Sequence, residues 1–133
     1  MNLLVMAPEP VDAETVRAAL DGEDLGDAKI LYIAPALQDS AVKFWTSDAD
    51  DAIAEAQANA DETERSLQAE GVQASAVTGE SEPLLALQDA LATFQADRVV
   101  VFVRDGDEQA YREDDVIGEA ERRFNVPVTQ ARL

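Results

Sequence analysis

The residues most able to do chemistry follow the apolar run 98–103, which predicts a buried strand. Arg104 stands directly after that run, and its cation would suit an anionic ligand, although ion pairing with a neighbouring carboxylate is the simpler interpretation. Carboxylate oxygens that Mg²⁺ or Ca²⁺ would accept come next, at Asp105, Asp107, Glu108, Asp114 and Asp115. Their spacing does not match a calcium loop. Solvated acids at a helix start explain them better, and no metal site is predicted.

The residue types that are missing exclude several kinds of chemistry. The chain has no Cys and no His, so thiol nucleophiles, disulfides, imidazole bases and His-ligated zinc are all excluded. Paired carboxylates for acid–base catalysis cannot be chosen among 28 acids, and nothing identifies a nucleophile. We therefore expect the protein not to be an enzyme. A metal-assisted hydrolase built on the acid cluster is the third-ranked interpretation.

The charge balance limits the partners. With 28 Asp and Glu against 10 Lys and Arg, the formal net charge of the 133 residues is -18, which repels phosphate backbones and anionic lipid. We thus expect no nucleic-acid and no membrane partner. Only Lys29 and Lys43 are lysines, and acid-rich, lysine-poor chains suit salt-rich cells, where carboxylate repulsion is screened. A halophilic source is the favoured hypothesis; an acidic protein from a GC-rich mesophile is the alternative.

No targeting or membrane segment is expected. No stretch approaches the roughly 20 apolar residues that a membrane span needs. The first residues lack a basic region and lead directly into an expected strand, which is not the pattern of a signal peptide. A cytoplasmic location follows by default.

The elements that position these residues alternate between two periodicities. Strands are predicted at 3–7, 29–34, 72–78, 98–103 and 126–129, with Pro127 favouring an edge position for the last. Helices are predicted between them: one after an N-cap at Asp12, one over 48–70, one opening near Pro83, and one ending at Arg122 and Arg123. This order predicts one doubly wound α/β domain over residues 1–133, with a mainly parallel, Rossmann-like sheet of five strands.

Side chains within these elements have predicted roles. The inner face of the helix over 48–70 is predicted to carry Ile53, Ala56, Ala60, Thr63 and Leu67. Phe44 and Trp45 lie in a polar connection, where capping of the core or a subunit contact is favoured over a ligand pocket. Thr78 and Ser81 flank Gly79 at a strand-to-helix turn and could donate to an anion, although Ser81 is more simply an N-cap.

Three segments together resemble the universal stress protein family. Residues 78–84 (Thr-Gly-Glu-Ser-Glu-Pro-Leu) resemble its Gly-[Asp/Glu]-Pro-x-x-x-[Ile/Leu] step, and residues 96–103 resemble its Ala-Asp-Leu-Ile-Val-Val-Gly strand. Residues 118–128 resemble its closing helix and Cys-Pro-Val strand. The resemblance covers nearly the whole chain. It implies strand order 3-2-1-4-5 and a homodimer that pairs through the last strand, at Val126, Val128 and Gln130.

Family members that bind ATP use an aspartate after the first strand and a glycine-rich loop after the fourth. Here Ala7 and Pro8 follow the first strand, and only Gly106 of the first glycine pair is kept. Gly118 matches the last glycine, but Glu119 replaces the hydroxyl residue, and acids would rim the phosphate position. We therefore expect no bound cofactor. The residues that would line the ligand site are Ala7, Pro8, Gly79, Arg104, Gly106 and Gly118.

Two functions compete on these grounds. The first is a stress-related sensing or protein-interaction module with a degenerate nucleotide site, in a salt-adapted cytoplasm. The alternative is a protein that binds an adenine nucleotide or another small anion at the point where the strand order reverses, with Arg104 and the backbone near Gly79 and Gly118.

Overall fold

The computed structural model describes residues 1–20, 22, 25–35, 49–79, 83–103 and 116–132. Five strands in these ranges form one parallel sheet, β3-β2-β1-β4-β5, and four helices accompany them. This confirms the predicted doubly wound, Rossmann-like α/β fold with strand order 3-2-1-4-5. The strands are β1 (Asn2–Met6), β2 (Lys29–Pro35), β3 (Gln73–Gly79), β4 (Arg98–Val103) and β5 (Val128–Arg132). The helices are α1 (Ala13–Ala19), α3 (Ala49–Ala69), α4 (Pro83–Thr93) and α6 (Val116–Phe124).

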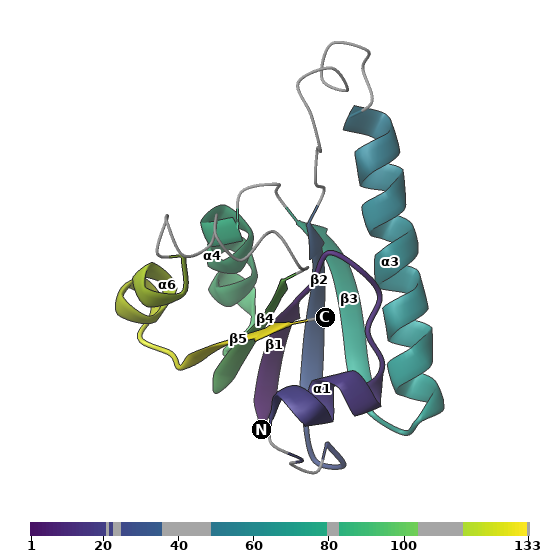
Figure 1. Ribbon diagram of the computed structural model, residues 1–133, viewed down its shortest axis with the longest axis horizontal. Coiled ribbons are helices and arrows are strands. Elements are labelled where there is room, and N and C mark those ends of the chain that lie inside the picture. Colours follow the sequence, from purple (N-terminus) through teal and green to yellow (C-terminus); the bar gives the residue numbers. More distant parts are fainter. Residues whose placement is uncertain (21, 23–24, 36–48, 80–82, 104–115, 133) are drawn as a thin grey trace.

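Helices cover both faces of the sheet (Figure 1). On the α1/α3 face, Leu3, Val5 and Tyr32 meet buried side chains of α1 and α3. On the α4/α6 face, Leu4 and Met6 meet buried side chains of α4 and α6. Successive side chains of a strand point to opposite faces, so the inner strands need apolar residues at every position. β4 meets this requirement, since every residue after Arg98 is buried, as its sequence predicted.

Helix α1 begins as the sequence predicted. The Asp12 carboxylate accepts a hydrogen bond from the backbone N–H of Thr15 at 2.8 Å, which is the expected N-cap. That bond favours the ionised form and lowers the pKa of Asp12 below its ordinary value. Val11 and Val16 are both buried on either side of the cap.

The predicted inner face of α3 is confirmed except at one position. Ala56, Ala60, Thr63 and Leu67 are buried, but Ile53 is 52% exposed, so its predicted burial was wrong. α3 extends past the ends of β2 and β3 (Figure 1), so its first turns have no sheet beneath them. Ile53 therefore shares the helical spacing of the core positions, but it has no strand to pack against.

The last strand begins later than predicted. β5 runs from Val128, so Val126 and Pro127 precede it rather than lie within it. Among the described strands it pairs with β4 alone, which confirms the edge position. Val126 and Val128 are each 8% exposed and pack in the core of the α4/α6 face, whereas Gln130 is exposed.

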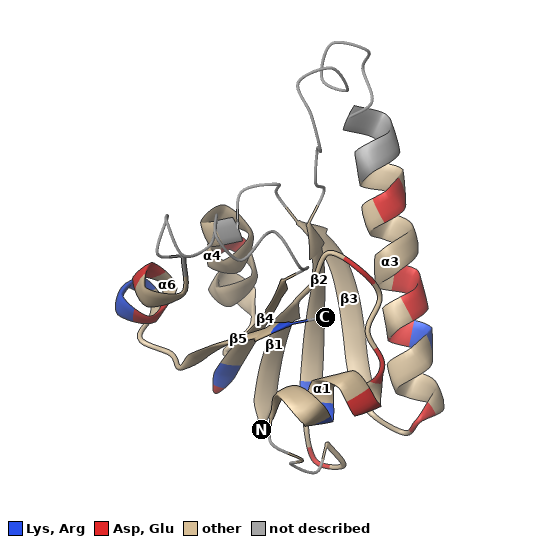
Figure 2. Cartoon of the chain, viewed as in Figure 1, with Lys and Arg blue, Asp and Glu red and all other residues tan. Residues whose placement is uncertain are grey.

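Charge is confined to the outside of this architecture. Figure 2 shows the described Asp and Glu residues on helices and connections, with none on the strands. The only charged residues on the described strands are the basic residues Lys29, Arg98 and Arg132. No helix of the described chain is both long enough and apolar enough to cross a membrane.

Candidate functional site

Successive strands are added toward one edge of the sheet up to β3 and toward the other edge from β4 on, so the order switches between β1 and β4. Ligands of open α/β sheets bind beyond the carboxyl ends of the strands at such a switch point. Ala7 and Pro8 follow β1 at this place, with Ala7 buried and Pro8 half-buried. Arg104, Gly106 and the acid cluster of residues 105–115 lie outside the described residues, as do Phe44 and Trp45. The geometry available for the predicted site is therefore that of the junction between β1 and α1, residues 7–12.

The carbonyl groups of this junction are held by the rest of the chain. The Tyr32 hydroxyl of β2 lies 3.1 Å from the carbonyl oxygen of Ala7 and 2.8 Å from that of Glu9, and its single proton is shared between the two. The side-chain amide of Asn59 on α3 donates to the carbonyl oxygen of Pro8 at 3.2 Å. Two elements distant in sequence thus fix the path of the chain after β1.

Two of the four N–H groups of the junction, those of Ala7 and Val11, are also occupied. The N–H of Ala7 donates to Ile33 of β2 at 3.3 Å, and that of Val11 donates to the buried hydroxyl of Thr63 at 3.2 Å. Pro8 and Pro10 have no N–H. A phosphate held at such a turn needs several free backbone donors that converge on it. The junction therefore offers a phosphate few donors, and Glu9 adds a repelling carboxylate.

The N-terminus of α1 is occupied in the same way. Besides the Asp12 cap, the Glu70 carboxylate accepts a hydrogen bond from the N–H of Ala13 at 3.1 Å. Helix N-termini attract anions because their first N–H groups lack helical partners. Here carboxylates of the chain itself take that place, so the positive end of α1 is already compensated.

Tyr32 is the centre of this arrangement. Its side chain is fully buried, and burial raises the pKa of its hydroxyl to about 12. It therefore remains a proton donor throughout the neutral range. The sequence placed Tyr32 in a buried strand and Thr63 on an inner helix face without assigning either a role. The signal in the sequence is a hydroxyl group at a position predicted to be buried, because a buried hydroxyl needs a hydrogen-bond partner.

Gly79 is required for packing. It ends β3, and a Cβ built on it would lie 2.7 Å from Cγ2 of Ile33 and 3.3 Å from Cβ of Ala86 on α4. The absence of a side chain thus lets α4 approach the sheet. This explains the residue without a ligand.

The remaining predicted residues lie apart from the junction. Gly118 is half-buried in α6, followed by Glu119, whose carboxylate oxygens lie 3.1 Å from Arg122 and 3.1 Å from Arg123. These hydrogen bonds lower the pKa of Glu119. No group of three or more acids is placed to hold a metal ion within the described ranges.

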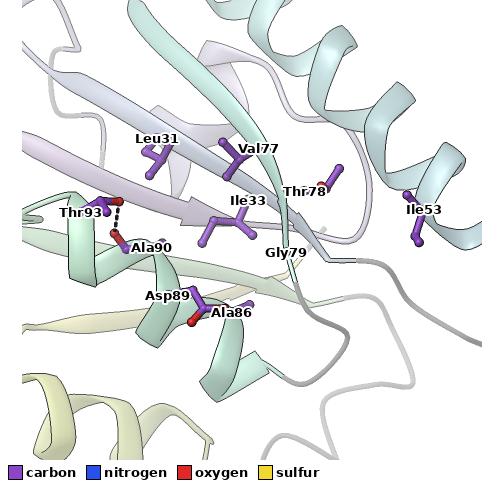
Figure 3. A pocket seen from close by; sticks show the side chains of 10 residues that line it. All are labelled: Leu31, Ile33, Ile53, Val77, Thr78, Gly79, Ala86, Asp89, Ala90 and Thr93. Atoms are coloured by element: carbon purple, nitrogen blue, oxygen red, sulfur yellow. Dashed lines mark hydrogen bonds between the residues drawn. The ribbon is translucent and has the colours of Figure 1, made fainter.

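A hollow that the sequence did not indicate lies at the other side of the sheet. It has a volume of about 530 Å³ and opens between α4 and the α4/α6 face of β2 and β3, reaching Ile53 of α3 past the strand ends (Figure 3). Its polar side chains are few and its walls mostly apolar: Leu31, Ile33, Ile53, Val77, Thr78, Gly79, Ala86, Asp89, Ala90 and Thr93. Gly79 is the one predicted site residue among them.

Comparison with known proteins identifies no relative: no family model matches the chain, and no curated protein matches its sequence. The resemblance to universal stress proteins therefore stays a prediction from the motifs.

Proposed function

We propose that this chain is a universal-stress-protein-like domain that acts as a sensing or protein-interaction module rather than as an enzyme or an ATP carrier. The observed strand order is compatible with that family but common to other doubly wound folds. The acidity of the chain supports a salt-adapted cytoplasm as its setting. A homodimer through β5 is part of the proposal, with Gln130 as the exposed side chain of the predicted three.

The observation that carries this proposal is the β1–α1 junction. Its carbonyls are bound by Tyr32 and Asn59, and its N–H groups at Ala7 and Val11 are bound by Ile33 and Thr63. Two further positions are proline. A binding loop of the family type would have to break these bonds before it offered its backbone to phosphate. The junction is built as a fixed structural connection.

Electrostatics points in the same direction. Glu9, Asp12 and Glu14 surround the start of α1, and each carboxylate near a triphosphate costs on the order of 1 kcal/mol even at high dielectric. Arg17 is the only base between residues 1 and 20. Binding of adenine nucleotide, the competing function, would depend on Arg104 and Gly106, beyond the described residues.

Thermal unfolding with nucleotides tests this proposal. ATP, AMP and cyclic AMP, each with and without Mg²⁺ in molar KCl, should leave Tm unchanged at millimolar concentration. Tripolyphosphate at equal ionic strength is the control for unspecific anion effects. A ligand present at 100 times its Kd would add about 2.7 kcal/mol to the free energy of unfolding, so true binding would be evident. A nucleotide-specific rise in Tm, absent with tripolyphosphate, would replace the proposal with the adenine-nucleotide function.

A further inference from the structure

The outer side of β3 exposes backbone hydrogen-bonding groups. Lys29 donates its N–H to Met1, and Ile33 accepts from Ala7, so the odd-numbered residues of β2 face β1 and the even-numbered ones face β3. The register Tyr32↔Ala76 then directs the odd-numbered residues of β3 to β2. The backbone groups of Ala74, Ala76 and Thr78 thus point outward. The side-chain amide of Gln68 accordingly donates to the carbonyl oxygen of Ala74 at 3.0 Å.

β3 lacks the features that usually protect an edge strand. Its seven residues, Gln-Ala-Ser-Ala-Val-Thr-Gly, contain no charge and no proline. The opposite edge, β5, has five residues, follows Pro127 and contains Arg132. Charged side chains, prolines and short length are the usual means of preventing further strand addition. Among the described residues, no segment pairs with β3 beyond β2.

Apolar surface lies next to this edge on the α4/α6 face. Among the described elements, α4 packs mainly against β2 and α6 and reaches β3 at Gly79, so Val77 on that face of β3 stays exposed. Val77 is 44% exposed there and Leu31 is half-buried (Figure 3). The hollow of about 530 Å³ and a second one of about 680 Å³ both include Leu31 in their lining. We call the surface along Val77 and the two hollows the β3 groove. It has room for apolar side chains of an added strand.

Acidic side chains flank the same edge on the α1/α3 face. Gln68 reaches the edge, and residues one, two and three turns earlier on that side of α3 are Glu64, Asp61 and Gln57. Between residues 53 and 69, α3 carries Glu55, Asp61, Glu62 and Glu64 against the single base Arg65. Basic side chains of an added strand would therefore be attracted.

We propose that the outer side of β3 is a docking site for an extended peptide segment of a partner protein, in which basic side chains alternate with apolar ones. The period of two places the apolar side chains beside Val77, on the face where the two hollows open, and the basic ones beside Asp61 and Glu64. A second copy of this chain fits less well, because it would bring its own acidic α3 to the same edge. This inference rests on the proposed function, since it names the partner class of an interaction module.

Binding of a defined peptide to the full chain tests the inference. The probe is the blocked, fluorescein-labelled peptide Thr-Lys-Val-Arg-Val-Lys-Val-Thr, followed by anisotropy at the lowest KCl concentration at which the chain is folded and again in molar KCl. We expect saturable binding that weakens with salt. Amide NMR shifts should change at Ala74, Ala76 and Thr78. A peptide with Glu in place of its basic residues should not bind, nor should one N-methylated on alternate residues.

Variants of the chain locate the site. Val77→Lys places a cation in the β3 groove and should weaken binding by at least about tenfold. Leu85→Lys is the matched control, because Leu85 is 45% exposed and lies on α4, and it should bind like the wild type. The double variant Asp61→Asn, Glu64→Gln should weaken binding about two- to fivefold. Ala76→Pro removes an outward N–H but no bond to β2, and it should also reduce binding, with the NMR spectrum confirming the fold.

Three outcomes would overturn the inference. One is equal binding by the N-methylated peptide, which would show electrostatic attraction without strand addition. Another is NMR shifts confined to β5 or to the β1–α1 junction. The third is a wild-type dimer in sedimentation equilibrium that Val77→Lys dissociates, which would make a second copy the occupant. Nucleotide binding without these outcomes would refute the proposed function and leave this site intact, so the two can fail separately.

Discussion

The β1–α1 junction and the outer side of β3 are separated only by β2, and they differ in how their backbone groups are satisfied. In the junction, side chains of Tyr32, Asn59 and Thr63 bond the backbone from neighbouring elements. At β3, Gln68 bonds one outward carbonyl, and no described segment continues the sheet. Buried backbone groups need hydrogen-bond partners inside the chain. Groups at an exposed sheet edge can bond water and exchange it for a strand from another molecule.

A position favoured by the fold is not automatically a binding site. The switch point of the sheet is the usual ligand position, yet its β1 side is closed by internal hydrogen bonds and two prolines. The uncharged edge strand β3 and the β3 groove lie two strands away from the switch point. We therefore look for partners of this chain at β3 as well as at β5.

Crowding at the end of β3 gives the largest expected effect. Gly79→Val places its Cβ against Ile33 and Ala86 and should lower the free energy of unfolding by about 3 kcal/mol, measured by chemical denaturation. Ser75→Val, on the same strand and face but exposed, should be neutral or slightly stabilising. Equal effects of the two substitutions would mean that Gly79 does not limit the approach of α4.

Removal of the Tyr32 hydroxyl tests whether the junction is held as described. Tyr32→Phe leaves the carbonyls of Ala7 and Glu9 without this donor and should cost about 2 kcal/mol. Because the pKa of Tyr32 is raised to about 12, the wild-type contribution is fully present below pH 10 and is lost as pH rises toward 12. The difference between variant and wild type should therefore shrink over that range. A constant difference would argue against the burial that raises this pKa, whereas the absence of a loss at neutral pH would argue against the hydrogen bonds.

The smallest effect is expected on the open face. Val77→Ala should change the free energy of unfolding by about 0.5 kcal/mol or less, because Val77 is 44% exposed. The same substitution at the fully buried Val101 of β4 removes two methyl groups from the core and should cost about 2 kcal/mol. Denaturation of both variants measures the contrast. A large loss at Val77 would mean that the β3 groove is closed in solution.

Much of the fold could be predicted from the sequence because its signals are local. Asp12 as an N-cap, β4 as a buried strand and β5 as an edge follow from residue type and spacing, and all three are confirmed. Ile53 was predicted to be buried because it shares the helical period of Ala56 and Ala60. Periodicity cannot show that α3 outruns the sheet, and so it could not predict the exposure of Ile53.

The candidate site was less accessible to sequence reasoning. Motif comparison directed attention to Ala7, Pro8 and Gly79 as ligand contacts, and all three have structural explanations in the fold. The side chains that bond the backbone of the junction, Tyr32 and Thr63, come from separate elements. Their partners are 25 and 52 positions away in the chain, and no local pattern records such pairs.

By itself, the sequence determined the alternation of strands and helices, the absence of thiol and imidazole chemistry, and the net charge of -18. These depend on residue type, period and count. Only the tertiary structure decided that the N–H groups of Ala7 and Val11 after β1 are occupied, that Gly79 serves packing, and that the uncharged β3 is an edge of the described sheet beside acids of α3. Hydrogen-bond satisfaction and exposure belong to the arrangement of distant segments in space, and for that reason they appear only once the chain is folded.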